Sequence, residues 1–128
     1  MKLRALTAAA LLAVGPAYAD PAGGIWKTQP DDNGNFGHVQ ISECGPAVCG
    51  VLVRAFDGSG AARPSEHLNK RILWDMAAKG GGSYSGGKIF APDRGKTYNS
   101  KMTLAGSTLK VSGCVLGICR EQTWKRVQ

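Results

Sequence analysis

The segment from Ser83 to Leu104 constrains the fold more than any other part of this chain, because it has the pattern of a β-hairpin. Its centre, residues 92–95, reads Pro-Asp-Arg-Gly. Proline and aspartate suit the two central positions of a type I turn, and glycine accepts the left-handed conformation that leads into the next strand. After this turn, one face of the second strand should carry Tyr98, Ser100, Met102 and Leu104. The chain is therefore expected to consist of further strands arranged around this hairpin.

The remaining segments predict short strands and no amphipathic helix. Further strands are expected at residues 23–28, 37–43, 51–56, 71–76, 108–113 and 120–127. Turn formers or polar residues dominate three other segments, which are expected to be loops: residues 31–35, residues 57–70 and the glycine-rich, flexible residues 77–82. Alternation with polar residues predicts buried side chains at Val39, Ile41, Leu109 and Val111. Eight strands separated by turns favour an antiparallel meander.

The two ends of this meander have matching sequences, which favours closure into a barrel. Gly24-Ile25-Trp26-Lys27 and Thr123-Trp124-Lys125-Arg126 are both short aromatic and basic strands. A long meander with one apolar face avoids open edges when its first and last strands pair. We expect Trp26 and Trp124 to lie at this closure, with Arg126 stacked on the face of Trp26. The predicted fold is all-β, a small eight-stranded antiparallel up-and-down barrel.

Residues 1–19 have the pattern of a secretory signal peptide. A basic start is followed by the apolar run Ala5–Val14 and then by Ala17-Tyr18-Ala19, a typical cleavage site before Asp20. The apolar run is too short to span roughly 30 Å of hydrocarbon, and no lipobox cysteine follows it, so neither a membrane anchor nor a lipid anchor is expected. We predict an exported protein, periplasmic or secreted, with a single domain at residues 20–128.

The four cysteines form two Cys-x4-Cys pairs, Cys44 with Cys49 and Cys114 with Cys119. Export to an oxidising compartment favours disulfides. In a hairpin with a four-residue loop, positions i and i+5 lie opposite one another, so the two local bridges are favoured over the two crossed pairings.

Metal and redox sites are alternatives for these cysteines, and their spacing disfavours them. A four-thiolate zinc site uses Cys-x2-Cys more naturally, a thioredoxin-like pair needs Cys-x-x-Cys at a helix start, and c-type haem needs Cys-x-x-Cys-His. None of these spacings occurs in the sequence. We therefore expect no metal and no cofactor.

The basic residues are spread singly along the chain. The formal charge of +7 falls to +5 once Lys2 and Arg4 leave with the signal peptide. Only Lys70-Arg71 and Lys125-Arg126 are adjacent, and no stripe of bases with interleaved aromatic residues appears, so nucleic-acid binding is not expected. The basic surface is consistent with weak contact to anionic membrane headgroups or acidic polymers. No oligomeric state follows from the sequence.

The combined motifs resemble one family, the bacterial exported proteins called DUF2147, over nearly all of residues 23–126. The residues that carry the resemblance are Gly24-x-Trp26, the Cys-Gly pairs at 44–45 and 49–50, Ile72-Leu73, Gly86-Gly87-x-Ile89-Phe90-x-Pro92-x-x-Gly95-x-Thr97-Tyr98, Leu109-x-Val111-x-Gly113-Cys114 and Gln122-Thr123-Trp124. The resemblance implies a small lipocalin-like, or calycin-like, β-barrel whose biochemical role has not been settled. Members often carry Asp-x-x-Asn-Pro before the fourth strand, where this chain has Glu66-His67-Leu68-Asn69-Lys70.

The sequence offers little support for an enzyme. His38 is expected to point outward from a strand and His67 to lie in a polar loop, where a lone histidine is usually a surface residue. The chain has no Gly-x-Ser-x-Gly elbow, no His-Glu-x-x-His and no phosphate-binding glycine loop before a helix. No catalytic residue is therefore predicted.

Binding of a small hydrophobic or amphipathic ligand inside the barrel is the favoured function. An eight-stranded barrel is just wide enough to be filled by side chains or to hold one small ligand. Candidates for the pocket wall are Arg54, Trp74, Tyr84, Tyr98 and Met102, although the large apolar ones also suit simple core packing. Arg54 would be a counter-charge for an anionic ligand if it points inward, and a surface residue if it points outward. The alternative is an envelope interaction or structural protein whose barrel is packed solid.

Overall fold

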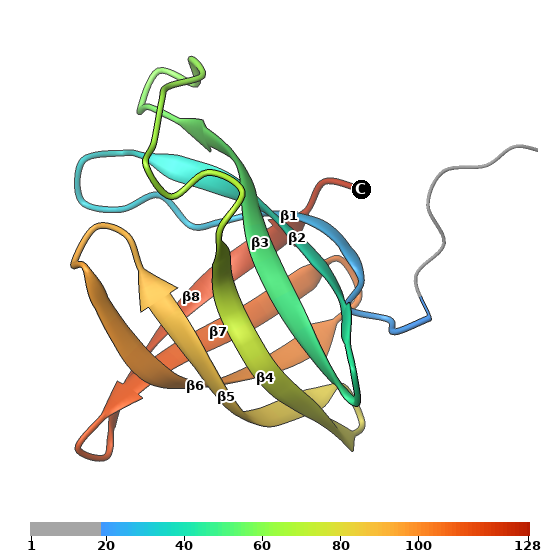
Figure 1. Ribbon diagram of the computed structural model, residues 1–128. Coiled ribbons are helices and arrows are strands. Elements are labelled where there is room, and N and C mark those ends of the chain that lie inside the picture. The colour runs from blue at the N-terminus through green and yellow to red at the C-terminus, as the bar shows by residue number, and fades with distance from the viewer. Residues whose placement is uncertain (1–18) are drawn as a thin grey trace, which may run out of the picture.

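The strands pair in chain order and the last strand pairs with the first, which closes the sheet. The computed structural model describes residues 19–128, and these form an antiparallel barrel of eight strands (Figure 1). The predicted fold class is therefore confirmed. The signal peptide predicted for residues 1–19 lies almost entirely outside the described residues. Within residues 19–128 there is no helix of the length and hydropathy needed to cross a membrane.

Most strands run slightly longer than the sequence predicts, although the first strand is shorter than the predicted residues 23–28. They are β1 (Gly24–Lys27), β2 (Phe36–Cys44), β3 (Ala47–Phe56), β4 (Arg71–Gly80), β5 (Ser83–Ala91), β6 (Lys96–Ala105), β7 (Thr108–Val115) and β8 (Ile118–Arg126). The prediction of a flexible turn at residues 77–82 is wrong for its first four residues. Ala77 and Ala78 pair with Ser85 and Tyr84, so the ladder to β5 extends β4 despite its low strand propensity there.

The hairpin between β5 and β6 has the predicted turn. The N–H groups of Arg94 and Gly95 both donate to the carbonyl of Ala91, at 3.1 and 2.8 Å. Gly95 has a φ of 63°, the left-handed conformation for which glycine was expected at this position. Local turn chemistry therefore determines this connection.

The inner face of the barrel holds the apolar core. Val39, Ile41, Leu109 and Val111 are at most 1% exposed, as the alternation of the sequence predicts. The same core contains the indole rings of Trp26 and Trp124 together with Leu73, Met76, Tyr84 and Met102. Because successive side chains of a strand point to opposite faces, each strand contributes its apolar set to one interior.

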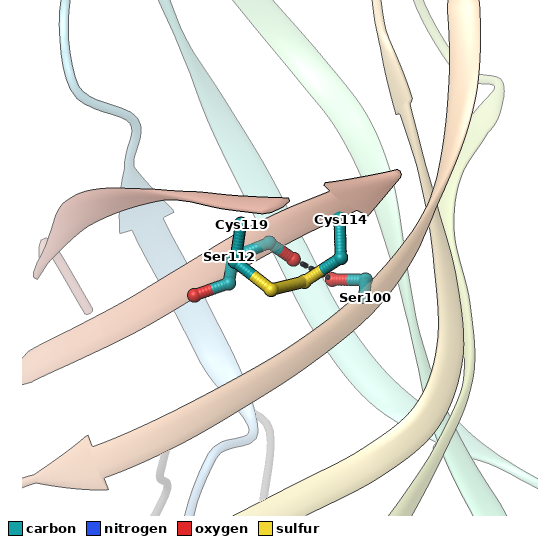
Figure 2. Close-up of a disulfide and its surroundings, with 4 residues drawn as sticks. All are labelled: Ser100, Ser112, Cys114 and Cys119. Carbon is teal, nitrogen blue, oxygen red and sulfur yellow. Dashed lines mark hydrogen bonds between the residues drawn. A yellow bond between two sulfur atoms is a disulfide. The ribbon is translucent and has the colours of Figure 1, made fainter. Parts of the chain in front are cut away.

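Both disulfides are local. Cys44 is bonded to Cys49 at the β2–β3 turn, and Cys114 to Cys119 at the β7–β8 turn (Figure 2). Cys114 lies directly opposite Cys119, with only a two-residue turn beyond the next pair. Cys44 lies opposite Ala47 instead, so its bridge to Cys49 is diagonal rather than directly across. The two bridges indicate an oxidising environment, as in exported proteins.

Behind the second disulfide, the barrel wall contains a buried polar contact. The Ser100 hydroxyl of β6 donates to the carbonyl of Ser112 on β7 at 2.7 Å, and both serines are nearly inaccessible (Figure 2). A buried hydroxyl is tolerated when it is hydrogen-bonded, so this contact satisfies Ser100 within the wall.

The N-terminal segment covers one end of the barrel at the seam between β1 and β8. Trp26 is paired with Arg126 in the ladder, and the guanidinium carbon of Arg126 lies 4.4 Å from the centre of the Trp26 ring, which confirms the predicted stacking. The Trp26 indole donates to the carbonyl of Ala22 at 2.9 Å, and the Tyr84 hydroxyl donates to Asp20 at 2.5 Å. Residues 20–23 are thus held to the barrel from several strands.

Backbone conformation and close packing explain why the first position of the Gly-x-Trp motif, Gly24, is a glycine. Its φ is 133°, and a side-chain carbon at this position would lie 2.8 Å from Nη1 of Arg126. The last residue of the chain also crosses here, because the N–H of Ile25 donates to the carbonyl of Gln128 at 2.6 Å. Only glycine leaves space for this arrangement.

Candidate ligand-binding site

A cavity of about 530 Å³ opens at the end of the barrel opposite the N-terminal segment. It lies among the loops that follow β1, β3 and β5, which gather at the upper left of the barrel in Figure 1. The turns after β2, β4 and β6 lie at the other end, on the right. The meander therefore places the loops that follow β1, β3 and β5 around one opening.

The floor of the cavity is apolar. Leu52 from β3, Ile72 from β4, Ile89 from β5 and Trp124 from β8 line it, and Leu52, Ile72 and Trp124 are almost completely buried. The indole N–H of Trp124 donates to the side-chain oxygen of Gln122, at 2.9 Å, and Gln122 also lines the cavity. The Trp124 N–H is therefore satisfied by the protein, and the rest of the floor offers an apolar surface.

Small residues on the inner face help to leave this space unfilled. Gly37 of β2 and Ala55 of β3 are cross-strand partners, and both line the cavity. A side-chain carbon on Gly37 would lie 2.6 Å from a methyl group of Leu52. A larger residue at either position would project into the opening.

Aromatic rings surround the mouth. Phe36 and Phe56 are stacked at 4.9 Å between ring centres, and Phe90 of β5 packs against the His67 ring at 5.1 Å. All four line the cavity. His67 comes from the β3–β4 loop, and its side chain is 23% exposed and 3.6 Å from Glu66. The segment that departs from the family pattern thus contributes directly to the mouth.

The charged groups at the mouth are mixed. Three carboxylates, Asp31, Glu66 and Asp93, and one guanidinium, Arg63, line it. Asp31 is already engaged, because it accepts the N–H groups of Asn33 and Asn35 at 2.8 and 3.0 Å. Residues 19–128 bring together no group of His, Cys, Asp and Glu side chains that would hold a metal ion. The site is thus a cavity with an apolar floor and a polar mouth, a combination that is common in small-molecule sites.

The five pocket candidates chosen from the sequence lie elsewhere. Tyr84 and Met102 are buried in the core, at 4% and 2% exposure, and Tyr98 is half-buried opposite Ile89. Arg54 is exposed, and Trp74 lies opposite the exposed Lys88. None of the five lines the cavity. Of the two outcomes foreseen for Arg54, the structure shows the outward one.

Irregular strand pairing explains why alternation in the sequence did not identify the residues that line this cavity. The register shifts between Val48 and Gly50 and again between Gly50 and Val51, where β3 meets β4. Ile72 and Leu73 are both buried as a result, and strict alternation does not identify which neighbour faces inward. A better signal was present at the strand ends, because Phe36 begins β2, Phe56 ends β3 and Phe90 stands one residue before the end of β5.

Comparisons with known proteins agree with this architecture. A family model described as "Uncharacterized protein conserved in bacteria (DUF2147)" matches residues 24–126. Among solved structures, the fold is similar to HP1028 from the human pathogen Helicobacter pylori, a protein described as belonging to the lipocalin family. The TM-score is 0.67 at 23% identity, over 83% of this chain and 82% of that one. Among curated proteins, none matches this chain.

Proposed function

The chain belongs to the DUF2147 family, and we propose that it is an exported lipocalin-like protein that binds a small hydrophobic or amphipathic ligand and is not an enzyme. The ligand lies in the cavity at the open end of the barrel, with its apolar part on the floor formed by Leu52, Ile72 and Trp124. Its polar part faces the ring of aromatic and polar side chains at the mouth.

The observation that supports this proposal is the cavity itself. Small-molecule sites typically have volumes of about 300–1,000 Å³ and are lined by apolar side chains with a few polar groups. A cavity of about 530 Å³ falls within this range. Eight-stranded barrels also include proteins that hold one small ligand in their interior.

The proposed location is the periplasm, after cleavage of the signal peptide before Asp20. Two disulfides in a chain of 128 residues are typical of an oxidising compartment. The basic start, apolar run and Ala-Tyr-Ala site at residues 1–19 support export across the inner membrane. Sequencing the N-terminus of the protein purified from a periplasmic extract tests this, and a start other than Asp20 would count against it.

Ligand binding is tested by native mass spectrometry of the protein purified from its own compartment, followed by fluorescence titration. Trp124 lines the cavity, so an apolar probe bound there should change the tryptophan emission. We expect a co-purifying small molecule, or saturable quenching by long-chain fatty acids and alcohols. Absence of both would refute the binding function.

A second candidate function is that of an envelope interaction protein, and the β7–β8 hairpin tip favours it. Val115, Leu116 and Ile118 are 52%, 95% and 70% exposed. Leu116 has a φ of 52°, a conformation that bulky residues rarely adopt. An exposed leucine in a strained turn has no evident role in folding, and on a protein of net positive charge it suits contact with an anionic membrane.

Vesicle sedimentation distinguishes this second function. Wild-type protein should bind vesicles of phosphatidylglycerol and phosphatidylethanolamine, and Leu116→Asn should abolish binding, since asparagine accepts the same turn conformation. The control is Val127→Asn, which removes a 50% exposed apolar residue near the C-terminus. Equal sedimentation of both variants would reject a role for the tip.

A further inference from the structure

Three basic side chains lie in register on the outer face of the barrel. Lys27 of β1 is the ladder partner of His38 on β2, and His38 is the partner of Arg54 on β3. Neighbouring strands are about 4.8 Å apart, so the three residues form a short row across the sheet. We call Lys27, His38 and Arg54 the cationic row.

The two permanent charges of this row have no carboxylate partner. The ion pairs found within residues 19–128 are His67 with Glu66 and Lys110 with Glu121, and neither involves Lys27 or Arg54. Burial lowers the pKa of His38, and the charges of Arg54 and then Lys27 lower it further. Within residues 19–128, no carboxylate therefore lies at ion-pair distance from either permanent charge of the row.

The row adjoins the cavity through a shared pair of aromatic rings. The ammonium of Lys27 lies 4.6 Å from the centre of the Phe36 ring, and the guanidinium carbon of Arg54 lies 5.2 Å from that of Phe56. The ring of His38 is also against Phe56, at 4.7 Å. Because Phe36 and Phe56 line the mouth, the cations stand directly beside its rim.

Three carboxylates also line the mouth, and none of them forms an ion pair with Lys27 or Arg54. Asp31 is held by its own loop, Asp93 lies in the turn between β5 and β6, and the Glu66 side chain is 84% exposed. Arg63 lines the mouth as well, and its backbone N–H donates to the carbonyl of Ala55 at 2.9 Å. Its charge, however, acts on the nearby Asp57 carboxylate, whose pKa is lowered mainly by the hydrogen bond from Ser59 and further by Arg63. Lys27 and Arg54 are therefore cations beside this rim that remain without an ion-pair partner among residues 19–128.

We propose that the ligand of the cavity is an anionic amphiphile, whose carboxylate or phosphate group binds the cationic row while its alkyl chain enters the cavity past Phe36 and Phe56. This inference rests on the proposed binding function and specifies its ligand class. Ammonium and guanidinium groups bind carboxylates and phosphates through charge-assisted hydrogen bonds, which are stronger than neutral ones. Phe36 and Phe56 lie between the cationic row and the cavity, so their rings would contact the ligand where its charged group joins its alkyl chain.

The test compares probes of one chain length by isothermal titration calorimetry at fixed ionic strength. Laurate, dodecanol and dodecylammonium have the same chain and differ in headgroup charge, and inorganic phosphate supplies an anion without a chain. We expect laurate to bind about tenfold more tightly than dodecanol, with dodecylammonium weakest. Inorganic phosphate should bind far more weakly than laurate, because it gains nothing from the apolar floor.

Substitution then assigns the preference to the row. Lys27→Gln/Arg54→Gln should bring laurate to the affinity of dodecanol and leave dodecanol unchanged. The matched control, Lys79→Gln/Lys101→Gln, removes two exposed charges from β4 and β6 and should retain the laurate preference. Circular dichroism of both double variants checks that the barrel is intact.

The outcomes separate this inference from the function on which it rests. Equal binding of laurate and dodecanol by the wild type would overturn the anionic class and leave the carrier function standing. The anionic class would also be overturned, and the carrier function would stand, if both double variants lose the preference for laurate over dodecanol equally. Binding of inorganic phosphate as tight as that of laurate would have the same consequence. Failure of every chain probe to bind would overturn the carrier function and this inference together.

Discussion

The guanidinium carbon of Arg126 lies over the Trp26 ring, 4.4 Å from its centre. The two terminal nitrogens of the same guanidinium donate to the carbonyls of Gly23 and Pro21, at 2.8 and 2.7 Å. One side chain of the last strand thus joins the first strand and the segment that covers the barrel end. Arg126 reinforces a seam that otherwise consists of a short ladder between β1 and β8 and the backbone hydrogen bonds of Ile25 with Val127 and Gln128.

Replacing Arg126 by Gln should lower the free energy of unfolding by about 2 kcal/mol, because it removes a partly buried cation–π contact and two charged hydrogen bonds. Urea denaturation followed by tryptophan fluorescence measures the change. The control is Lys125→Gln on the same strand, where the ammonium reaches only the Thr108 hydroxyl at 3.5 Å, and its effect should stay below about 0.5 kcal/mol. Similar losses for both variants would contradict this role of Arg126.

Tyr84 should titrate at unusually high pH. Burial, followed by its hydrogen bond to Asp20, raises the pKa of Tyr84 to about 12. In the unfolded chain the phenol ionises near its reference value of 10.0. The stability contributed by the neutral phenol is therefore fully present below pH 10 and is lost as the pH rises to about 12. Ultraviolet difference titration of wild type against Tyr84→Phe measures the ionisation, and a difference signal centred near pH 10 would contradict it.

Filling the cavity should abolish binding without unfolding the barrel. Ala55→Phe places a ring in the open space beside Gly37, so the affinity for an apolar probe should fall more than about tenfold, while the stability changes by about 1 kcal/mol or less. Fluorescence titration with laurate and thermal unfolding measure the two effects. Ala105→Phe, at an exposed position near the β6–β7 turn, is the control. Retained binding in Ala55→Phe would show that the ligand lies elsewhere.

His38 should have a lowered pKa and should respond to an anion. Burial and the neighbouring charges of Arg54 and Lys27 hold the pKa of His38 below its usual value of 6.5. The unfolded chain then binds this proton first, so the His38 contribution to stability is complete above pH 6.5 and falls as the pH decreases toward the folded pKa. Titration of the histidine resonances by NMR measures the shift.

Saturation with laurate should raise the pKa of His38, because a carboxylate offsets the two cations. In Lys27→Gln/Arg54→Gln the free protein should already show a higher His38 pKa. A His38 pKa at or above 6.5 in the free wild type would contradict the lowered pKa, and a His38 pKa that laurate leaves unchanged would contradict the proposed position of the carboxylate.

Much of the fold follows from local patterns. The turn at residues 92–95, the inward set Val39, Ile41, Leu109 and Val111, and the Trp26–Arg126 closure were all predictable, because each depends on turn chemistry, strand alternation or a match between two short motifs. The local disulfides were likewise favoured by spacing, although the bridge of Cys44 is diagonal.

The wall of the cavity was not predictable in this way. Arg54 interrupts an apolar run in the sequence, yet a register shift between His38 and Val39 places Leu52 opposite Val39 and leaves Arg54 exposed. The same kind of irregularity buries Ile72 and Leu73 together and places Trp74 opposite an exposed lysine. One shift in register reverses which side chains face the interior, and no local pattern in these strands signals it.

The amino-acid sequence alone determines that this chain forms a closed antiparallel barrel of eight strands, because alternation and turn chemistry act between near neighbours. Only the tertiary structure decides that Gly37, Ala55, Ile89 and Trp124 surround an open space and that Lys27, His38 and Arg54 align beside it. Some of these residues come from consecutive strands and others from opposite ends of the chain, and their meeting depends on bulges and register, which arise from the packing of the whole barrel.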